Sequence, residues 1–139
     1  MRGRRFLGFL ASRRKARDRE LVIKVHRVNT GSAVIRPIGH VDLASSPLLR
    51  RALTDLVAEG CDLRVDLSGV RKMHSSGVAI LVEGFHAARG NGTRFALVGV
   101  TVSLMRLLEL ARLETLLPIH RNTTSVPTGT VDRPLAVAA

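Results

Sequence analysis

Residues 66–82, DLSGVRKMHSSGVAILV, join the end of a short strand pattern to a long apolar helix pattern. The strand, LRVDL at residues 63–67, is apolar enough to be buried. The helix is predicted over residues 76–89, because apolar residues recur at helical spacing and the GNG that begins at residue 90 favours a stop. Two serines and a histidine therefore stand where this helix begins. The apolar face of the helix comprises Val78, Leu81, Val82 and Phe85.

Upstream of this stretch, the sequence predicts a β-hairpin and then a helix. LVIKVHRV and AVIRPIG alternate as strands around the turn NTGS. Pro37 has no N–H, so we expect its strand to leave that position unpaired, at a sheet edge or a bulge. In SSPLLRRALTDLVAEG, Ser46 is the expected cap, Pro47 suits the first turn and Gly60 suits the stop. The apolar stripe of this helix comprises Leu48, Leu49, Ala52, Leu53, Leu56 and Val57.

Downstream, strand and helix patterns continue to alternate. RFALVGV predicts a strand, residues 102–112 a helix, and LLPIH a last short strand. This order predicts an α/β fold with a mixed, mostly parallel sheet of about four to five strands, an N-terminal hairpin, and helices packed against the sheet. The inward residues of the last helix are expected to be Leu104, Leu107, Leu108 and Ala111.

The length of 139 residues predicts one folded domain, over residues 21–120. Residues 1–20 hold eight basic and two acidic residues, a net charge of +6 out of the +11 of the whole chain. We expect a flexible basic leader there, with a contact to anionic lipid or nucleic acid as the alternative. The lack of Trp and Tyr weighs against nucleic acid, so no such partner is expected. Residues 121–139 are expected to form a disordered tail.

Cysteine and hydropathy patterns exclude several classes of protein. Cys61 is the single cysteine and cannot form an internal disulfide, and no Cys/His cluster has metal-ligand spacing. We therefore expect a cytoplasmic protein without a structural metal. No segment reaches the apolar length of a transmembrane helix, so no transmembrane segment is expected.

Several elements, in order, resemble the STAS domain family, in particular the bacterial anti-sigma factor antagonists. The family's Gly-x-x-Asp element is matched by residues 39–42, GHVD, and its Asp-Leu-Ser run by residues 66–68. Its Asp-Ser-Ser/Thr-Gly signature and following apolar helix are matched by HSSGVAILV, and its later strand and helix by RFALVGV and VSLMRLLELARLETLLPI. One position departs from the pattern, because His74 stands where the family usually has aspartate.

The resemblance implies a switch in transcriptional regulation. A serine-kinase anti-sigma factor is expected to bind the unmodified protein, which frees a sigma factor, and to phosphorylate Ser75, which ends the binding; a phosphatase removes the phosphate. The kinase brings its own ATP, so no cofactor is expected on this chain. The expected partner surface comprises Asp42, His74, Ser75, Ser76 and Gly77.

Other interpretations of these residues remain open. Ser75 or Ser76 could simply cap the helix, and Asp42 could be a turn residue. With His74 in place of aspartate, the chain could instead be a STAS scaffold or ligand-sensing module that is not phosphorylated. Ser75, His74 and Asp66 supply nucleophile, base and acid, but no Gly-x-Ser-x-Gly elbow, Walker loop or metal constellation accompanies them, so we expect no enzyme.

Overall fold

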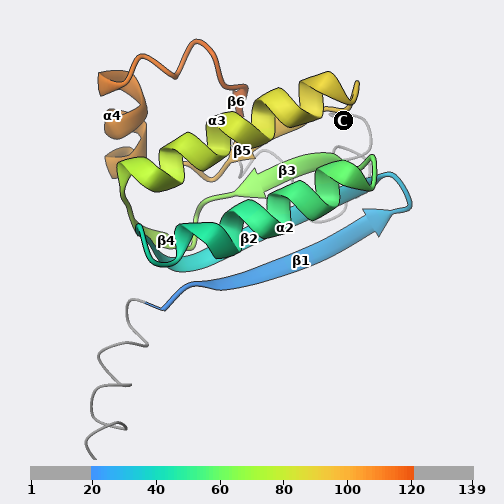
Figure 1. The fold of residues 1–139 in the computed structure, drawn as a ribbon. Helices are drawn as coiled ribbons and strands as arrows, with labels where there is room; N and C mark the ends of the chain where they lie inside the picture. Colours follow the sequence, from blue (N-terminus) through green and yellow to red (C-terminus); the bar gives the residue numbers. More distant parts are fainter. Residues whose placement is uncertain (1–19, 121–139) are drawn as a thin grey trace, which may run out of the picture.

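The structure of the chain is a computed structural model that describes residues 20–120 (Figure 1). The predicted leader, apart from Glu20, and the predicted tail lie outside the described residues. The elements follow the predicted order, with one short strand added between residues 70 and 73. They are β1 Val22–Asn29, β2 Ser32–Val41, α2 Ser46–Ala58, β3 Asp62–Asp66, β4 Val70–Met73, α3 Ser75–Gly90, β5 Phe95–Val98, α4 Val102–Leu110 and β6 Ile119–His120.

The strands form one six-stranded sheet in the order β1-β2-β3-β5-β6, with β4 paired to β2. β1 and β2 are the antiparallel hairpin that the sequence predicts, and the other pairs are parallel. The mixed, mostly parallel sheet is therefore confirmed. The sequence did not predict β4.

The sequence predicts Pro37 at a sheet edge or a bulge. Pro37 lies in an internal strand, so the prediction of a sheet edge is wrong. Along one side β2 pairs with β1, where Pro37 is opposite Ile23. Along the other side β2 pairs with β3 through residues 32–35 and with β4 through residues 39–41. Pro37 falls between these two ladders, where a missing N–H costs no parallel strand bond.

The end of β2 bends at Gly39, which has a φ of +118° and lies at a register shift in the pairing with β4. A side chain at this position would collide with the backbone carbonyl of Glu20. The N–H of Gly39 donates to the carbonyl of Gly69 at 3.0 Å, which ties this bend to the turn before β4. Glycine here sets the direction in which the chain leaves β2 toward Asp42.

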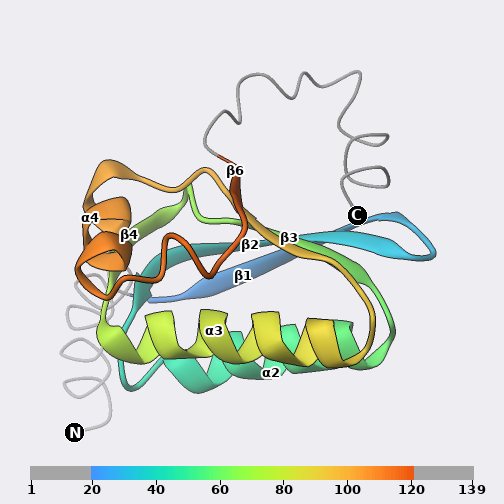
Figure 2. The ribbon, with the colours of Figure 1, turned by 90° about the horizontal axis from the view of Figure 1, so that it is seen from above.

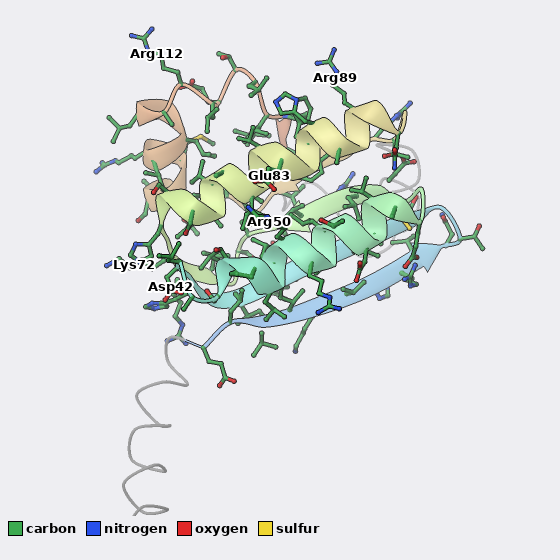
Figure 3. The ribbon with its side chains drawn as sticks, viewed as in Figure 1. Asp42, Arg50, Lys72, Glu83, Arg89 and Arg112 are labelled. Carbon is green, nitrogen blue, oxygen red and sulfur yellow. The ribbon has the colours of Figure 1, made fainter. Side chains whose placement is uncertain are left out.

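Helices α2 and α3 lie side by side on one face of the sheet, and α4 lies at the end of the sheet where α3 begins (Figures 1 and 2). Apolar residues from the sheet and all three helices form one core. On the outer side, the Arg50 guanidinium of α2 donates to both carboxylate oxygens of Glu83 on α3, at 3.0 and 2.9 Å (Figure 3). Both side chains are about half exposed, so this pair adds little to stability.

Three details of the helices differ from the predictions. The N-cap of α2 is Ser45, and Ser46 is a buried first residue of the helix. Leu48, placed in the apolar stripe, is 49% exposed because it lies in the first turn, beyond the edge of the core. Ala111 follows the end of α4 and is exposed. The predicted inward residues Leu104 and Leu108 are buried.

Candidate functional site

The starts of α2 and α3 lie at the same end of the sheet, next to the last residues of β2 and β4 (Figures 1 and 2). Val41 ends β2 and pairs with Met73, which ends β4. The N–H of His74 then donates to the carbonyl of Val41 at 2.8 Å. This pairing brings the Asp42 loop next to the first turn of α3, so the structure places the predicted site residues at one end of the fold.

Asp42 closes the loop before α2 through a reciprocal set of hydrogen bonds with Ser45. Its Oδ1 accepts from the Ser45 N–H at 2.9 Å, and its own N–H donates to Ser45 Oγ at 2.9 Å. The Ser45 hydroxyl has one proton to share between the His40 carbonyl at 2.9 Å and Asp42 Oδ1 at 3.1 Å. The structure thus confirms the turn role of Asp42, and its contact with a partner stays a prediction.

The electrostatics of this loop favour an ionised Asp42. The hydrogen bonds from the backbone and hydroxyl of Ser45, then the Ala44 amide and the charge of a protonated His74, lower the pKa of the Asp42 carboxyl. Partial desolvation opposes them. The charge of His74 is the smallest of these contributions, so the hydrogen bonds of the loop itself mainly lower the pKa of Asp42.

His74 occupies the N-cap position of α3, in an extended backbone conformation with φ −90° and ψ 170°. Its side chain makes no capping hydrogen bond and is exposed. Its carbonyl accepts the first helical bonds, from the N–H groups of Gly77 at 2.9 Å and Val78 at 3.2 Å. The N–H groups of the two serines come before these bonds, at the positive end of the helix dipole.

Ser75 is the first residue of α3 and is exposed to solvent. The structure does not support the capping interpretation for either serine, because the cap position is one residue earlier and α3 has no side-chain cap bond. Ser75 Oγ is therefore an accessible hydroxyl that the helix does not use. Its phosphorylation stays a prediction.

Ser76 points into the structure, unlike its neighbour. Its Oγ is buried and has no hydrogen-bond partner among residues 20–120. Gly77 is also buried, and a Cβ at this position would lie 2.6 Å from Val41 Cγ1 and 2.8 Å from Met73 Cγ. Glycine therefore lets α3 approach the ends of β2 and β4 closely. The predicted surface thus divides into an exposed part, His74 and Ser75, and an inner part that supports it.

Sequence reasoning missed three exposed residues at this end of the fold. Leu43 follows Asp42 and is 80% exposed, although it is a large apolar side chain. The sequence held one signal for this exposure, because Leu43 is the one large apolar residue in the otherwise small and polar run DLASSP. Arg71 and Lys72 are exposed on β4, and Figure 3 shows Lys72 at the same corner as Asp42. No signal placed them there, because β4 itself was not predicted.

The carboxylate that a catalytic triad would need is used elsewhere. Asp66 Oδ1 accepts from the Ser68 N–H at 3.0 Å, and Oδ2 lies 3.8 Å from Arg36 Nε. Asp66 thus shapes the end of β3. Within residues 20–120, no group of three or more His, Cys, Asp or Glu side chains could hold a metal ion. No helix in the same range is long and apolar enough to cross a membrane.

Comparison with known proteins identifies the family. The family model described as "Mlab, STAS domain" matches residues 26–118 of the chain. The chain belongs to the STAS domain family. The matched residues include the starts of α2 and α3 and all of the sheet except the first four residues of β1 and the two-residue strand β6, so the site described above is part of the STAS domain.

Relatives of this STAS domain are anti-sigma factor antagonists. The anti-sigma-B factor antagonist of Bacillus subtilis (strain 168) is 30% identical over 91 residues, which cover 66% of this chain and 84% of the relative. That of Listeria monocytogenes is 31% identical over 98 residues, covering 70% of this chain and 86% of the relative. These matches place the chain in the anti-sigma factor antagonist family, whose members are regulators and not enzymes.

A solved structure has the same fold. The crystal structure of an anti-sigma factor antagonist from Mycobacterium paratuberculosis superposes with a TM-score of 0.69 at 25% identity, covering 82% of this chain and 95% of that one. The STAS fold predicted from the sequence is thereby confirmed.

Proposed function

We propose that this STAS domain is an anti-sigma factor antagonist whose partner is a serine-kinase anti-sigma factor, and that phosphorylation of Ser75 switches the interaction off. Unmodified, the chain binds the anti-sigma factor through the exposed start of α3 and the Asp42 loop, and a sigma factor is released. The kinase transfers the terminal phosphoryl group of ATP to Ser75 Oγ, ADP leaves, and the hydroxyl proton is released. A phosphatase hydrolyses the phosphoserine in the cytoplasm and restores binding.

The accessible hydroxyl of Ser75 carries this proposal. Ser75 is exposed in the first turn of α3, and the helix has no side-chain cap bond that a modification would break. A phosphate adds a charge of about −1.5 to −2 at neutral pH. At a helix start this charge lies near backbone N–H groups that have no helical partner, and these groups attract an anion. The folded domain can therefore carry the phosphate without loss of stability.

The same charge opposes the binding of a partner. A protein that covers the start of α3 must remove water from the phosphate, and an imperfectly paired buried ion costs several kcal/mol. Each ~1.4 kcal/mol corresponds to a tenfold change in affinity. Modification therefore releases the partner without unfolding the domain.

Leu43 supplies the apolar part of the proposed partner surface. Its side chain is 80% exposed in the loop that the Asp42–Ser45 hydrogen bonds hold in place. Burial of an exposed large apolar side chain by a partner is favourable, and a loop whose backbone is already held by hydrogen bonds loses little conformational entropy on binding. It lies in the loop beside His74, so one partner can cover Leu43 and Ser75 together.

His74 is the observation that favours a second function, a STAS scaffold or ligand-sensing module that is not phosphorylated. The exposed imidazole stands where the antagonist signature has aspartate, and it changes the charge next to Asp42. A kinase that recognises an acid before the serine would not recognise this chain. In that case the complex forms and persists while Ser75 stays unmodified.

A phosphorylation assay separates the two functions. The chain is incubated with ATP and candidate serine-kinase anti-sigma factors, and the modified residue is mapped by mass spectrometry. We expect one phosphate on Ser75, none in Ser75→Ala, and continued modification in Ser76→Ala. A stable complex whose Ser75 remains unmodified supports the scaffold.

The effect of charge on binding is tested with Ser75→Asp in the same assay. We expect the complex with the anti-sigma factor to weaken at least about tenfold while the melting temperature stays within a few degrees of wild type. Thr30→Asp is the matched control, because it adds the same charge in the exposed hairpin turn at the other end of the sheet (Figure 1). Equal weakening by both substitutions, or a large drop in the melting temperature of Ser75→Asp, would falsify the switch.

A further inference from the structure

A groove between β4 and α4 lies next to the proposed partner surface and is not explained by it. Its volume is about 290 Å³, and it is lined by all of β4, residues 70–73, and by Thr101, Ser103, Leu104 and Leu107 of the α4 segment. Figures 1 and 2 show β4 and α4 at the same end of the sheet. A groove of this size can take up one or two side chains of an occupant.

The charge of the groove is one-sided. Arg71 and Lys72 line it, both are exposed, and no acidic residue is among the lining residues. Neither cation makes an ion pair within residues 20–120. Two unpaired cations at one groove create a positive potential that attracts an acidic group.

The floor of the groove is apolar. Val70 is 7% exposed and Leu104 is 4% exposed, while Met73 and Leu107 are partly buried against the core. The groove therefore offers an apolar surface beneath a cationic rim. A free phosphate or another small anion would leave this floor uncovered, whereas a peptide that carries both acidic and apolar side chains would cover it.

The backbone of β4 favours an extended occupant. β4 pairs with β2 along one edge and with no other strand in the described part of the chain. No residue of β2 lines the groove, so the groove lies on the side of β4 that faces α4. The unpaired edge of a short strand is where an extended segment can add main-chain hydrogen bonds.

We propose that the protein partner of the Ser75 surface also lays an extended acidic segment into the β4–α4 groove. This inference rests on the proposed function for the identity of that partner. Acidic side chains of the segment pair with Arg71 and Lys72, and one or two apolar side chains cover the groove floor. Met73 lines the groove two residues before Ser75, so both contacts belong to one continuous interface. A phosphate on Ser75 then also repels the acidic segment.

The groove is tested first without any anti-sigma factor. The full-length, isotope-labelled chain is titrated in an NMR experiment with a short peptide that mixes Glu and Val, and with the same peptide carrying Lys for every Glu. We expect amide shifts at residues 70–73 and 101–107 with the Glu peptide and none there with the Lys peptide. Shifts elsewhere on the domain, or equal shifts with both peptides, would overturn the proposed groove.

The second test uses the complex and a matched pair of double variants. Arg71→Glu/Lys72→Glu should weaken both the Glu peptide and the complex with the unmodified chain about tenfold or more. Lys24→Glu/Arg51→Glu makes the same change in net charge at exposed positions outside the groove and should leave both affinities within about twofold of wild type. Equal effects of the two variants overturn the groove.

The two proposals fail in different ways. If Ser75→Asp disrupts the complex and Arg71→Glu/Lys72→Glu does not, the switch stands and the groove inference is wrong. If the Glu peptide binds in the groove but no kinase modifies Ser75, the groove stands as a docking site and the switch is wrong.

Discussion

Helices α2 and α3 begin at the same end of the sheet, each beside a pair of serines. Neither helix has a side-chain cap bond to its first turn, but the two starts use their serines differently. At α2, Ser45 and Asp42 exchange hydrogen bonds and Ser46 is buried, with its Oγ 3.3 Å from the Leu43 carbonyl. At α3, the cap residue makes no side-chain bond, Ser75 is exposed, and the buried Oγ of Ser76 has no partner in the described residues.

The difference separates structural serines from available ones. The α2 start uses its polar groups to hold the loop, so a modification there would break existing hydrogen bonds. The α3 start relies on close backbone packing at residue 77 and leaves a hydroxyl in solvent. A helix start that is held by packing and not by its side-chain hydroxyls can accept a change of charge with little cost to the fold.

The largest expected effect concerns the packing that holds the α3 start. In Gly77→Ala the new methyl group would lie 2.6 Å from the buried Val41 side chain and 2.8 Å from Met73, so the helix or the strand ends must move. Overpacking of this kind costs about 2 kcal/mol, which lowers the melting temperature of a domain of this size by roughly 10 °C. Thermal unfolding followed by circular dichroism measures the change.

Gly90→Ala is the control for this prediction, because it makes the same substitution at the other end of α3. A Cβ there meets no atom within 4 Å, and this residue does not need a positive φ. Alanine should be neutral or stabilise the domain by up to about 1 kcal/mol. If both variants unfold at the same temperature, close packing at residue 77 does not hold the α3 start.

The next effect contrasts the two kinds of serine directly. Ser45→Ala removes the hydroxyl that bonds to Asp42 N–H and to His40 or Asp42 oxygens, so we expect a loss of about 1 kcal/mol and a melting temperature lower by roughly 5 °C. Ser75→Ala removes a hydroxyl that caps nothing and should change stability by less than about 0.5 kcal/mol. A loss at Ser75 as large as at Ser45 would mean that the exposed hydroxyl has a structural role.

Local patterns in the sequence were sufficient for most of the fold. The alternation in β2 and the helical spacing in α2 and α3 each reflect one buried face, so these elements could be predicted from their own residues. β1 has no fully buried residue and is held by its pairing with β2. β4 could not, because four residues with the burial order buried, exposed, exposed, intermediate carry no period. Its structure comes from pairing with the distant β2.

The candidate site was predicted only in part, for the same reason. The family resemblance indicated Ser75 and Asp42, but the link between them passes through the bond from His74 N–H to Val41 O, which no local pattern encodes. The expected cap at Ser46 was one residue too late, because the reciprocal bonds with Asp42 select Ser45. Exposure of Leu43 depends on how this loop turns, so the sequence alone could not distinguish it from a core residue.

The smallest expected effect is a pH dependence of the α2 start. The Ser45 backbone and hydroxyl, with smaller contributions from Ala44 and His74, lower the pKa of Asp42 in the folded state. A carboxyl with a lowered folded pKa stabilises the fold at pH above its unfolded value of about 4, and this contribution is lost as the pH falls through the folded pKa. Asp42→Asn keeps an acceptor oxygen but carries no charge. Its melting temperature should be slightly below wild type near neutral pH, and the two should converge in acid. A difference that stays constant from neutral pH to well below pH ~4 would contradict an ionised, hydrogen-bonded Asp42.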